Sequence, residues 1–383
     1  MSTSGRRRAL TIAVEHAVDD FYQGVVPALV PLLVAIRGYD FARAGGIVLA
    51  ATLLASIAQP LFGVLADRRR VPGLRTAGML TAAGGIGVVG LTDSFAATWV
   101  AVLVSGLGIA AYHPEAARAV HGTGTGDRGM GWFTFGGLAG FAAGPPVTAV
   151  VLGGLGLGAT PLLALPAVVM AVVTATRRSP APATSTGPVL TTAAPAGEDR
   201  RRFVWLTTVI MTRSVLFYGV SAFLVLYLVG RLGAPLAVAG LALTAFTTAG
   251  AFATLTSSRI TARLGRAGTL LASYLAGAVA LGLLLATTSP VLAVVVSGLL
   301  GVALGVPVPV HTTLGQSYLP RHLGLASAVT LGLSVSAGGL ASPALGALAD
   351  HHGITAAMLA LLVFPALAAA CSVPLLARRP RPS

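Results

Sequence analysis

An apolar stretch near the start of the chain carries four ionisable side chains, Glu15, His16, Asp19 and Asp20. At about 100° per residue along a helix, the four fall within one arc of about 140° and share a polar face. A carboxylate beside an imidazole in a medium of low dielectric can bind or release a proton when its surroundings change slightly. We therefore predict proton binding by Asp20, Asp19 and His16; the alternative is a fixed polar network that joins helices. Glu15 lies nearer the membrane interface and is expected to be solvated.

Two further ionisable residues, His113 and Glu115, flank Pro114 in a later apolar stretch. If this stretch and the first cross a membrane in opposite directions, both residues reach the depth of Asp20, and we expect them to join its cluster. Alternatively, His113 satisfies backbone groups that the proline leaves free. Imidazoles and carboxylates also suit several divalent ions, but this spacing does not identify a metal site. We predict neither a metal nor a cofactor.

Fewer ionisable residues lie in the apolar stretches of the second half. Arg213 occupies the middle of one stretch, where it either pairs with a carboxylate or binds an anionic substrate. His311 follows Pro307 and Pro309, which are expected to break their helix as gating helices are often broken. His311 is either a satisfied cavity histidine or a substrate contact. Gln316 is either a hydrogen-bonding residue of a gate or a substrate contact. Tyr22, Gln23 and Tyr218 are further candidate substrate contacts, for which ordinary packing is the alternative.

The composition indicates that these residues lie in a membrane. Hydrophobic residues make up 55% of the 383 residues and charged residues 9%, whereas soluble domains carry roughly 25% charged residues. A net charge of +14 would suggest nucleic-acid binding in a soluble protein. Here the Arg residues lie between apolar runs, so no nucleic-acid partner is expected. Because no nucleophile or metal constellation faces the paired carboxylates, we also predict that the chain is not an enzyme.

Apolar runs long enough to cross a bilayer occur twelve times. We predict an all-α membrane protein whose twelve transmembrane helices form two pseudo-symmetric six-helix bundles. The predicted spans are residues 10–36, 44–66, 74–92, 96–118, 129–152, 158–176, 203–229, 236–257, 267–288, 290–317, 323–346 and 354–377.

The Arg residues predict which side of the membrane each loop faces, because cytoplasmic loops accumulate positive charge. Of the 25 Arg residues, 21 fall on one side, three on the other and Arg213 within a span. Both termini are therefore predicted to be cytoplasmic. Residues 177–202, rich in Pro, Thr, Ala and Ser, are predicted to form a flexible cytoplasmic linker. This linker would join an N-terminal bundle, residues 1–176, to a C-terminal bundle, residues 203–383.

The ionisable residues are concentrated in spans 1, 4, 7 and 10, the first span of each successive group of three. Equivalent helices of a repeated unit occupy equivalent places, so these four spans are expected to line a shared central cavity. On span 5, Gly136, Gly140 and Gly144 recur every four residues before Pro145 and Pro146. Small residues at this spacing allow close helix packing, and the prolines allow a bend.

These features resemble the major facilitator superfamily, whose members have twelve helices in two halves and move small solutes by alternating access. Gly63, Asp67 and Arg68 resemble the loop after the second helix, where the acid and the Arg help to latch the cytoplasmic side. The second half has Ala262 near the position that corresponds to Asp67. Gly140, Gly144 and Pro145 are similar to the fifth-helix motif of drug/proton antiporters, although the trailing glycines of that motif are absent.

The chain also resembles the fosmidomycin resistance protein group of this superfamily. The resemblance rests on HAVDDFY (16–22), QPLFGVLAD (59–67), YHPEAAR (112–118), QSYLPRHLG (316–324) and GALADH (346–351). Members of the group usually carry Asn then Asp where this chain has Asp19 and Asp20, and often a basic residue at the position of Arg213. Fosmidomycin is a small phosphonate anion, which suits Arg213 and the histidines chemically.

The residues and the resemblance together predict a secondary active transporter in the bacterial inner membrane. The predicted activity is proton-coupled efflux of a small drug or metabolite, such as a fosmidomycin-like anion, by alternating access. The alternative is proton-coupled uptake of a small organic solute. The expected partners are protons, a small-molecule substrate and the lipid bilayer, and the chain is expected to be a monomer.

Overall fold

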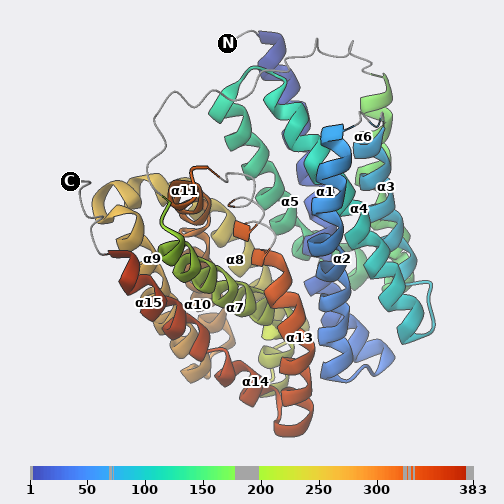
Figure 1. The fold of residues 1–383 in the computed structure, drawn as a ribbon. Coiled ribbons are helices and arrows are strands. Elements are labelled where there is room, and N and C mark those ends of the chain that lie inside the picture. Colours follow the sequence, from blue (N-terminus) through green and yellow to red (C-terminus); the bar gives the residue numbers. More distant parts are fainter. Residues whose placement is uncertain are drawn as a thin grey trace. The chain divides into compact units, whose positions relative to one another are not determined.

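The computed structural model describes residues 3–68, 71, 73–176, 198–321, 326, 329–330 and 333–376, and these residues form helices and the turns between them (Figure 1). Tertiary contacts divide the chain into two units. One comprises Met1–Gly38 and Gly46–Ala194, and the other comprises Tyr39–Gly45 and Pro195–Ser383. The second unit thus includes the first turn of α2, where the Asp350 carboxylate accepts hydrogen bonds from the N–H groups of Phe41 and Ala42.

The helices of the first half follow the predicted spans closely. They are α1 (Thr3–Arg37), α2 (Phe41–Arg68), α3 (Leu74–Val89), α4 (Phe95–His121), α5 (Gly126–Leu155), the 3₁₀ helix η1 (Leu157–Ala164) and α6 (Leu165–Thr176). Helix α4 begins at an N-cap, Ser94, whose side chain accepts a hydrogen bond from Ala97 N–H.

The helices of the second half are interrupted more often. They are α7 (Arg200–Leu232), α8 (Leu236–Ala253), the 3₁₀ helix η2 (Thr254–Thr256), α9 (Ser257–Ala286), α10 (Pro290–Gly305), α11 (Val308–Tyr318), α13 (Leu333–His352), α14 (Ile354–Ala360) and α15 (Val363–Leu376). The break between α10 and α11 falls at Pro307, as the prolines predict. Within α9, Gly265 adopts φ 71° and ends the helical piece that begins at Ser257.

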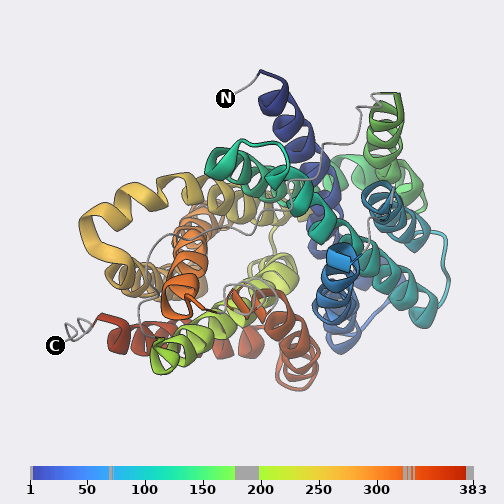
Figure 2. The ribbon, with the colours of Figure 1, turned by 45° about the horizontal axis from the view of Figure 1, so that its top comes forward.

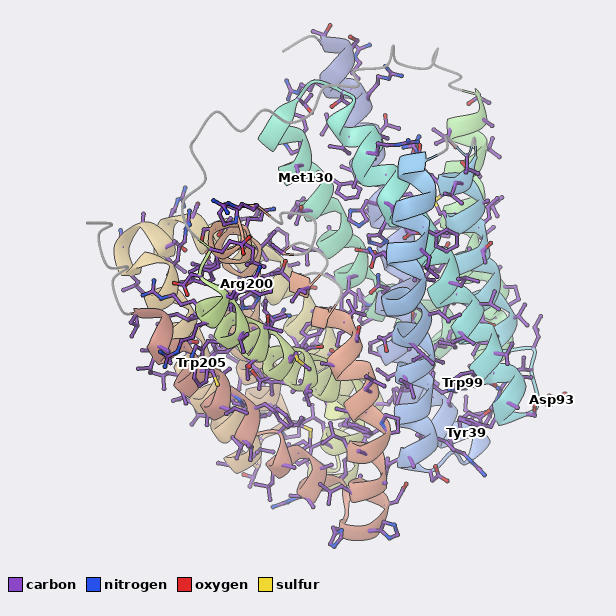
Figure 3. The ribbon with its side chains drawn as sticks, in the orientation of Figure 1. Tyr39, Asp93, Trp99, Met130, Arg200 and Trp205 are labelled. Atoms are coloured by element: carbon purple, nitrogen blue, oxygen red, sulfur yellow. The ribbon has the colours of Figure 1, made fainter. Side chains whose placement is uncertain are left out.

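Eight helical stretches in the described part of the chain are long and apolar enough to cross a membrane, among them Thr3–Arg37, Phe95–Val120 and Arg200–Leu232. The charged residue Asp93 precedes the N-cap of α4, and Arg200 is the first residue of α7, so neither lies midway along a helix (Figure 3). The all-α prediction is confirmed. Part of the eleventh predicted span lies outside the described residues. So does most of the predicted linker, whose last three residues form the first turn of α7.

The glycines of α5 bring this helix unusually close to α1 (Figures 1 and 2). A Cβ on Gly136 would overlap the carbonyl oxygen of Ala13, and a Cβ on Gly140 would overlap that of Ala17. The predicted close packing of this glycine stripe is therefore observed. It joins α5 to the helix that carries the ionisable cluster.

Replacing Gly140 by Val is expected to force α5 away from α1 and to lower the stability of the protein by about 1–3 kcal/mol or more. Thermal unfolding of the purified protein in detergent measures the change. Gly131→Val is the matched control, because Gly131 lies on the same helix and has no atom within 4 Å of an added Cβ. Equal stability of the two variants would contradict the close-packing interpretation.

Candidate functional site

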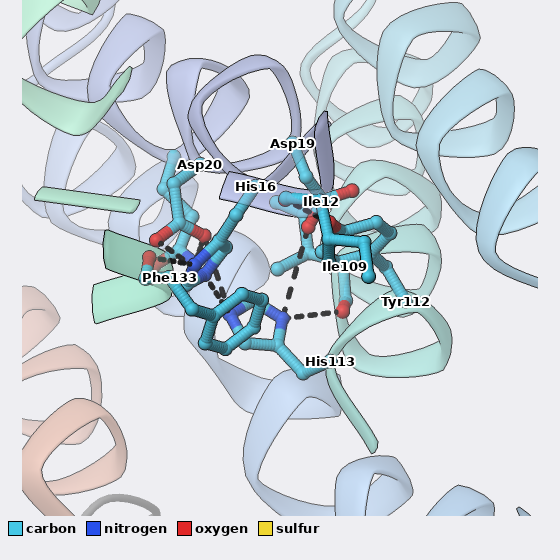
Figure 4. A network of polar contacts seen from close by, with 9 residues as sticks. Ile12, His16, Asp19, Asp20, Ile109, Tyr112, His113 and Phe133 are labelled. Carbon is cyan, nitrogen blue, oxygen red and sulfur yellow. Dashed lines mark hydrogen bonds and ion pairs between the residues drawn. The ribbon is translucent and has the colours of Figure 1, made fainter. Parts of the chain in front are cut away.

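Three side chains from α1 and α4 converge on one point inside the first unit (Figure 4). The Nε2 atoms of His16 and His113 lie 3.1 Å apart. Asp20 Oδ2 lies 3.2 Å from His16 Nε2, and Asp20 Oδ1 lies 3.3 Å from His113 Nε2. The structure therefore brings together Asp20, His16 and His113, as the sequence predicts. We call these three side chains the imidazole–carboxylate triad.

The Nδ1 atoms of both imidazole rings hydrogen-bond to backbone carbonyl oxygens. His16 Nδ1 lies 2.7 Å from the carbonyl oxygen of Phe133, and His113 Nδ1 lies 2.8 Å from that of Ile109. A carbonyl oxygen only accepts hydrogen bonds, so each Nδ1 carries a hydrogen. With neutral rings, two Nε2 lone pairs and a carboxylate would then face one another. One added proton, shared among these groups, turns the repulsion into hydrogen bonding.

The same atoms are suitable ligands for a divalent metal ion. One ligand atom from each residue of the triad lies within 4.8 Å of the others, and metal-binding histidines commonly donate their second N–H to a carbonyl. The sequence predicts no metal here, and this stays a prediction. A shared proton satisfies the same geometry.

Asp19 lies on the other side of His113 from the triad's carboxylate (Figure 4). Its side chain is fully buried, with 0% exposed. Its Oδ2 is 3.7 Å from His113 Nδ1, which is too long for a hydrogen bond. Neither carboxylate oxygen has a hydrogen-bond partner among the described residues. Asp19 is thus close to the triad without sharing its hydrogen bonds.

Glu15 differs from the expectation that it is solvated. It is 5% exposed, and its Oε2 forms an ion pair with Arg75 Nη1 at 2.9 Å. Arg75 belongs to α3, so this pair joins α3 to α1. The expectation was wrong because Arg75 follows a loop whose path the sequence does not reveal.

Glu115 was expected in the proton-binding cluster, but its observed contact is local. Its Oε2 accepts a hydrogen bond of 2.5 Å from Arg118, one turn further along α4. Gln23 was expected to contact substrate, and its amide instead donates to Asp20 Oδ1 at 3.0 Å. Tyr22 is fully buried, and its hydroxyl accepts a hydrogen bond from Ala167 N–H.

Two residues of α5 that sequence reasoning missed complete the surroundings of the triad. The Phe133 ring stacks on His16 with ring centroids 3.9 Å apart, and its carbonyl holds His16 Nδ1. Gly137 provides space, because a Cβ there would lie 2.5 Å from both Asp20 Oδ2 and His16 Cε1. Phe133 was missed because every residue has a backbone carbonyl, so the sequence does not show which carbonyl binds a ring nitrogen. Gly137 was missed because α5 holds several other glycines.

A polar cluster of Arg213, Tyr274 and His311 lies in the second unit. Arg213 Nε donates to the carbonyl oxygen of Leu304 at 3.0 Å, and the guanidinium lies 5.3 Å from the Phe217 ring centroid. No ion pair in the described part of the chain involves Arg213. His311 is buried and bonds to the Tyr274 hydroxyl at 2.8 Å. Tyr274 was not predicted, since a tyrosine in an apolar run usually packs.

The remaining candidates are placed as follows. Tyr218 is buried on α7 and packs edge-on against Phe217. Gln316 is exposed on α11, and Pro307 is the N-cap of that helix. Gly63, Asp67 and Arg68 belong to α2, but the structure does not describe the surroundings of these residues. Arg69 and Arg70 lie outside the described residues.

The fold and the sequence identify the class of protein. The family model of the Major Facilitator Superfamily matches residues 17–239 and 210–383. The chain belongs to this superfamily, and it is therefore a multi-pass membrane protein and a secondary transporter rather than an enzyme.

Two bacterial relatives cover most of the chain. The fosmidomycin resistance protein of Escherichia coli (strain K12) is 27% identical over 351 residues, which cover 90% of this chain and 86% of the relative. The uncharacterized MFS-type transporter YfnC of Bacillus subtilis (strain 168) is 28% identical over 379 residues, which cover 94% of this chain and 90% of the relative. The resemblance seen in the sequence motifs is confirmed.

Solved structures confirm the fold. A bacterial homologue of the human lysosomal transporter Spinster matches with a TM-score of 0.77 and 15% identity, covering 98% of this chain and 97% of that one. The nucleoside transporter NupG matches with a TM-score of 0.67 and 15% identity, covering 96% of this chain and 98% of that one.

A side chain at position 137 would occupy space beside the triad, so a substitution of Gly137 tests whether the triad's geometry matters. Gly137→Ala is expected to displace the Asp20 carboxylate and the His16 ring, since both are movable side-chain ends, while the helices stay in place. We expect transport to fall by about tenfold, the effect of roughly 1.4 kcal/mol, with thermal unfolding nearly unchanged. Gly131→Ala is the control. Wild-type transport by Gly137→Ala would show that the triad tolerates displacement.

Removing either partner of the Glu15–Arg75 pair is expected to have unequal effects. Arg75→Gln leaves a buried carboxylate without its cation and should lower stability by about 3–5 kcal/mol. Glu15→Gln should cost less, because the Arg75 side chain is 31% exposed and can turn toward water. Thermal unfolding of the two single variants and the double variant measures the difference. Equal losses would argue against a buried charge at Glu15.

Proposed function

We propose that the chain is a proton-coupled exporter of a small organic anion. The observation that carries this proposal is the imidazole–carboxylate triad, whose three groups are arranged to share one proton. An ionisable group at bilayer depth costs at least about 2.5 kcal/mol, so such residues are functional candidates by default. A permanently fixed network would not require two imidazole Nε2 atoms to face each other.

Proton binding and release would follow from the distances within the triad. With the proton bound, the positive charge on the imidazole pair is balanced by Asp20, to which Gln23 also donates. A shift of α4 along α1 would separate His113 from Asp20 and His16. The proton would then leave to water, and the bare carboxylate would favour rebinding when the helices return.

The substrate would bind at the polar cluster of Arg213, Tyr274 and His311 in the second unit. Arg213 has hydrogen-bond donors beyond the Nε that is bonded to Leu304, and its charge has no carboxylate partner among the described residues. His311 and Tyr274 add polar groups that can contact an oxyanion. A guanidinium binds a carboxylate or a phosphonate through two parallel hydrogen bonds, which favours a substrate carrying such a group.

Export is favoured over uptake by the relative that is named for fosmidomycin resistance, because removing a drug from the cell confers resistance. We further propose that the protein is a monomer in the bacterial inner membrane with both termini in the cytoplasm, as the Arg distribution predicts. Cytoplasmic closure would use Asp67 with Arg68. The glycines at 63, 140 and 144 and Pro307 would shape the helices that move.

Fosmidomycin susceptibility of an efflux-deficient bacterial host tests this function. The wild-type chain is expected to confer resistance, and Asp20→Asn is expected to abolish it because asparagine removes the charge that balances the shared proton. Arg213→Gln should also abolish resistance by removing the anion contact. Expression in the membrane must be matched among variants.

Asp93→Asn and Arg231→Gln are the controls, since they remove equivalent charges from a turn and from the end of α7. Full resistance from Asp20→Asn would rule out coupling through the triad. No resistance from well-expressed wild type would show that this chain does not export fosmidomycin. Increased susceptibility would indicate uptake.

A further inference from the structure

We propose that Asp350, near the end of α13, is a gating residue. It holds the first turn of α2 against α13 in the conformation described here, and it must release that turn during transport. The inference rests on the alternating access of the proposed function, because only a carrier that changes conformation needs to break this contact. The contact itself can be measured without any transport substrate.

The Asp350 carboxylate caps a helix that begins far away in the sequence. Its Oδ1 accepts a hydrogen bond from Phe41 N–H and its Oδ2 accepts one from Ala42 N–H, both at 2.8 Å. These are two of the four N–H groups that the start of a helix leaves without an intrahelical partner, and the positive end of the helix dipole also favours a carboxylate there. Helix α2 has a cap of its own as well, because Asp40 Oδ1 accepts from Arg43 N–H at 2.7 Å.

Two glycines bring the backbones of α2 and α13 together beside this cap. A Cβ on Gly45 of α2 would overlap the carbonyl oxygen of Ser342, and a Cβ on Gly346 of α13 would overlap that of Phe41. Close backbone packing is thus combined with two charge-assisted hydrogen bonds, which are stronger than neutral ones. Both hydrogen bonds are exposed, so water can bond to the same N–H groups when the helices separate.

The chain changes units on either side of this first turn. Tertiary contacts assign residues up to Gly38 to the first unit, Tyr39–Gly45 to the second, and the rest of α2 to the first again. A helix is stiff, so a displacement of one unit against the other must detach this turn from α13 or bend α2 at Gly45 and Gly46. The contacts favour detachment, because water can replace the Asp350 carboxylate, whereas a bend would disrupt main-chain hydrogen bonds within α2.

The chain just before α2 is anchored in the first unit. Arg37, the last residue of α1, donates from Nη1 to Thr98 Oγ1 at 2.6 Å and from Nη2 to the carbonyl oxygen of Val89 at 2.9 Å. Between this anchor and α2, Gly38 adopts φ 65°, a conformation that costs glycine little. The connection therefore has one fixed point in each unit with a glycine between them, and Asp350 provides the fixed point in the second unit.

Distances between two spin labels in the full chain, reconstituted in lipid, test this role. The labels are attached through Arg43→Cys and His352→Cys, which are exposed positions at the start of α2 and the end of α13, and Cys371→Ala removes the native thiol. With Asp350 intact, a population with a short distance is expected. Asp350→Ala is expected to lower the ratio of short to long distances by about tenfold, because two hydrogen bonds to a charged group are lost.

Asp40→Ala is the matched control, because it removes a carboxylate cap from the same turn without touching α13. It should leave the ratio unchanged. Asp350→Asn keeps the shape and one acceptor oxygen, so it should lower the ratio less than Asp350→Ala, and it decides the question if the alanine variant does not fold.

Three results would overturn the proposal. The chain with Asp350 could lack the short distance, or the Asp350 variants could leave the ratio unchanged, as a bend at Gly45 and Gly46 would. Alternatively, Asp40→Ala could lower the ratio equally, which would indicate fraying of the first turn instead of a specific hold by Asp350.

A disulfide across the contact tests whether transport requires its release. In a chain with Ala42→Cys, Asp350→Cys and Cys371→Ala, oxidation is expected to stop fosmidomycin movement in proteoliposomes, and a reducing agent is expected to restore it. Full transport by the oxidised protein, with the disulfide verified by mass spectrometry, would contradict the gating role. If the reduced protein moves no fosmidomycin either, the proposed function fails, and the spin-label distances still decide the role of Asp350.

Discussion

The cost of placing charge inside a bilayer governs the arrangement of this protein. Each ionisable side chain in the membrane-spanning helices must find a counter-charge, share a proton or become neutral. The first unit illustrates two of these solutions within two turns of α1. Glu15 pairs with Arg75, and Asp20 faces two imidazoles with which, under the proposed function, it shares a proton.

Backbone packing makes these solutions possible. The small residues of α5 let it approach α1 so closely that Phe133 can stack on His16 and hold Nδ1 through its carbonyl. A bulkier residue at Gly137 would occupy the space of the triad itself. The glycines therefore contribute to chemistry as well as to packing, although none of them carries a reactive group.

Much of the fold could be predicted from the sequence, because a membrane span needs about 20 apolar residues and leaves a long, unmistakable run. The pairing of His16 with Asp20 was predictable too, since residues four apart share a helix face. Glu15 was misjudged because its partner Arg75 lies beyond a turn, at a distance that no local pattern encodes. Phe133 and Tyr274 were missed because a backbone carbonyl and a tyrosine in an apolar run look like ordinary structure.

The tethered rings of His16 and His113 have a consequence for leakage. A free imidazole can rotate and pass a proton from one side of a membrane barrier to the other while no cargo moves. Here each ring would have to break the hydrogen bond at Nδ1 in order to turn, and the His16 ring is also stacked on Phe133. Under the proposed function, ring rotation would therefore not carry protons across the barrier, and proton movement would depend on the movement of whole helices, which suppresses slip by an idle carrier.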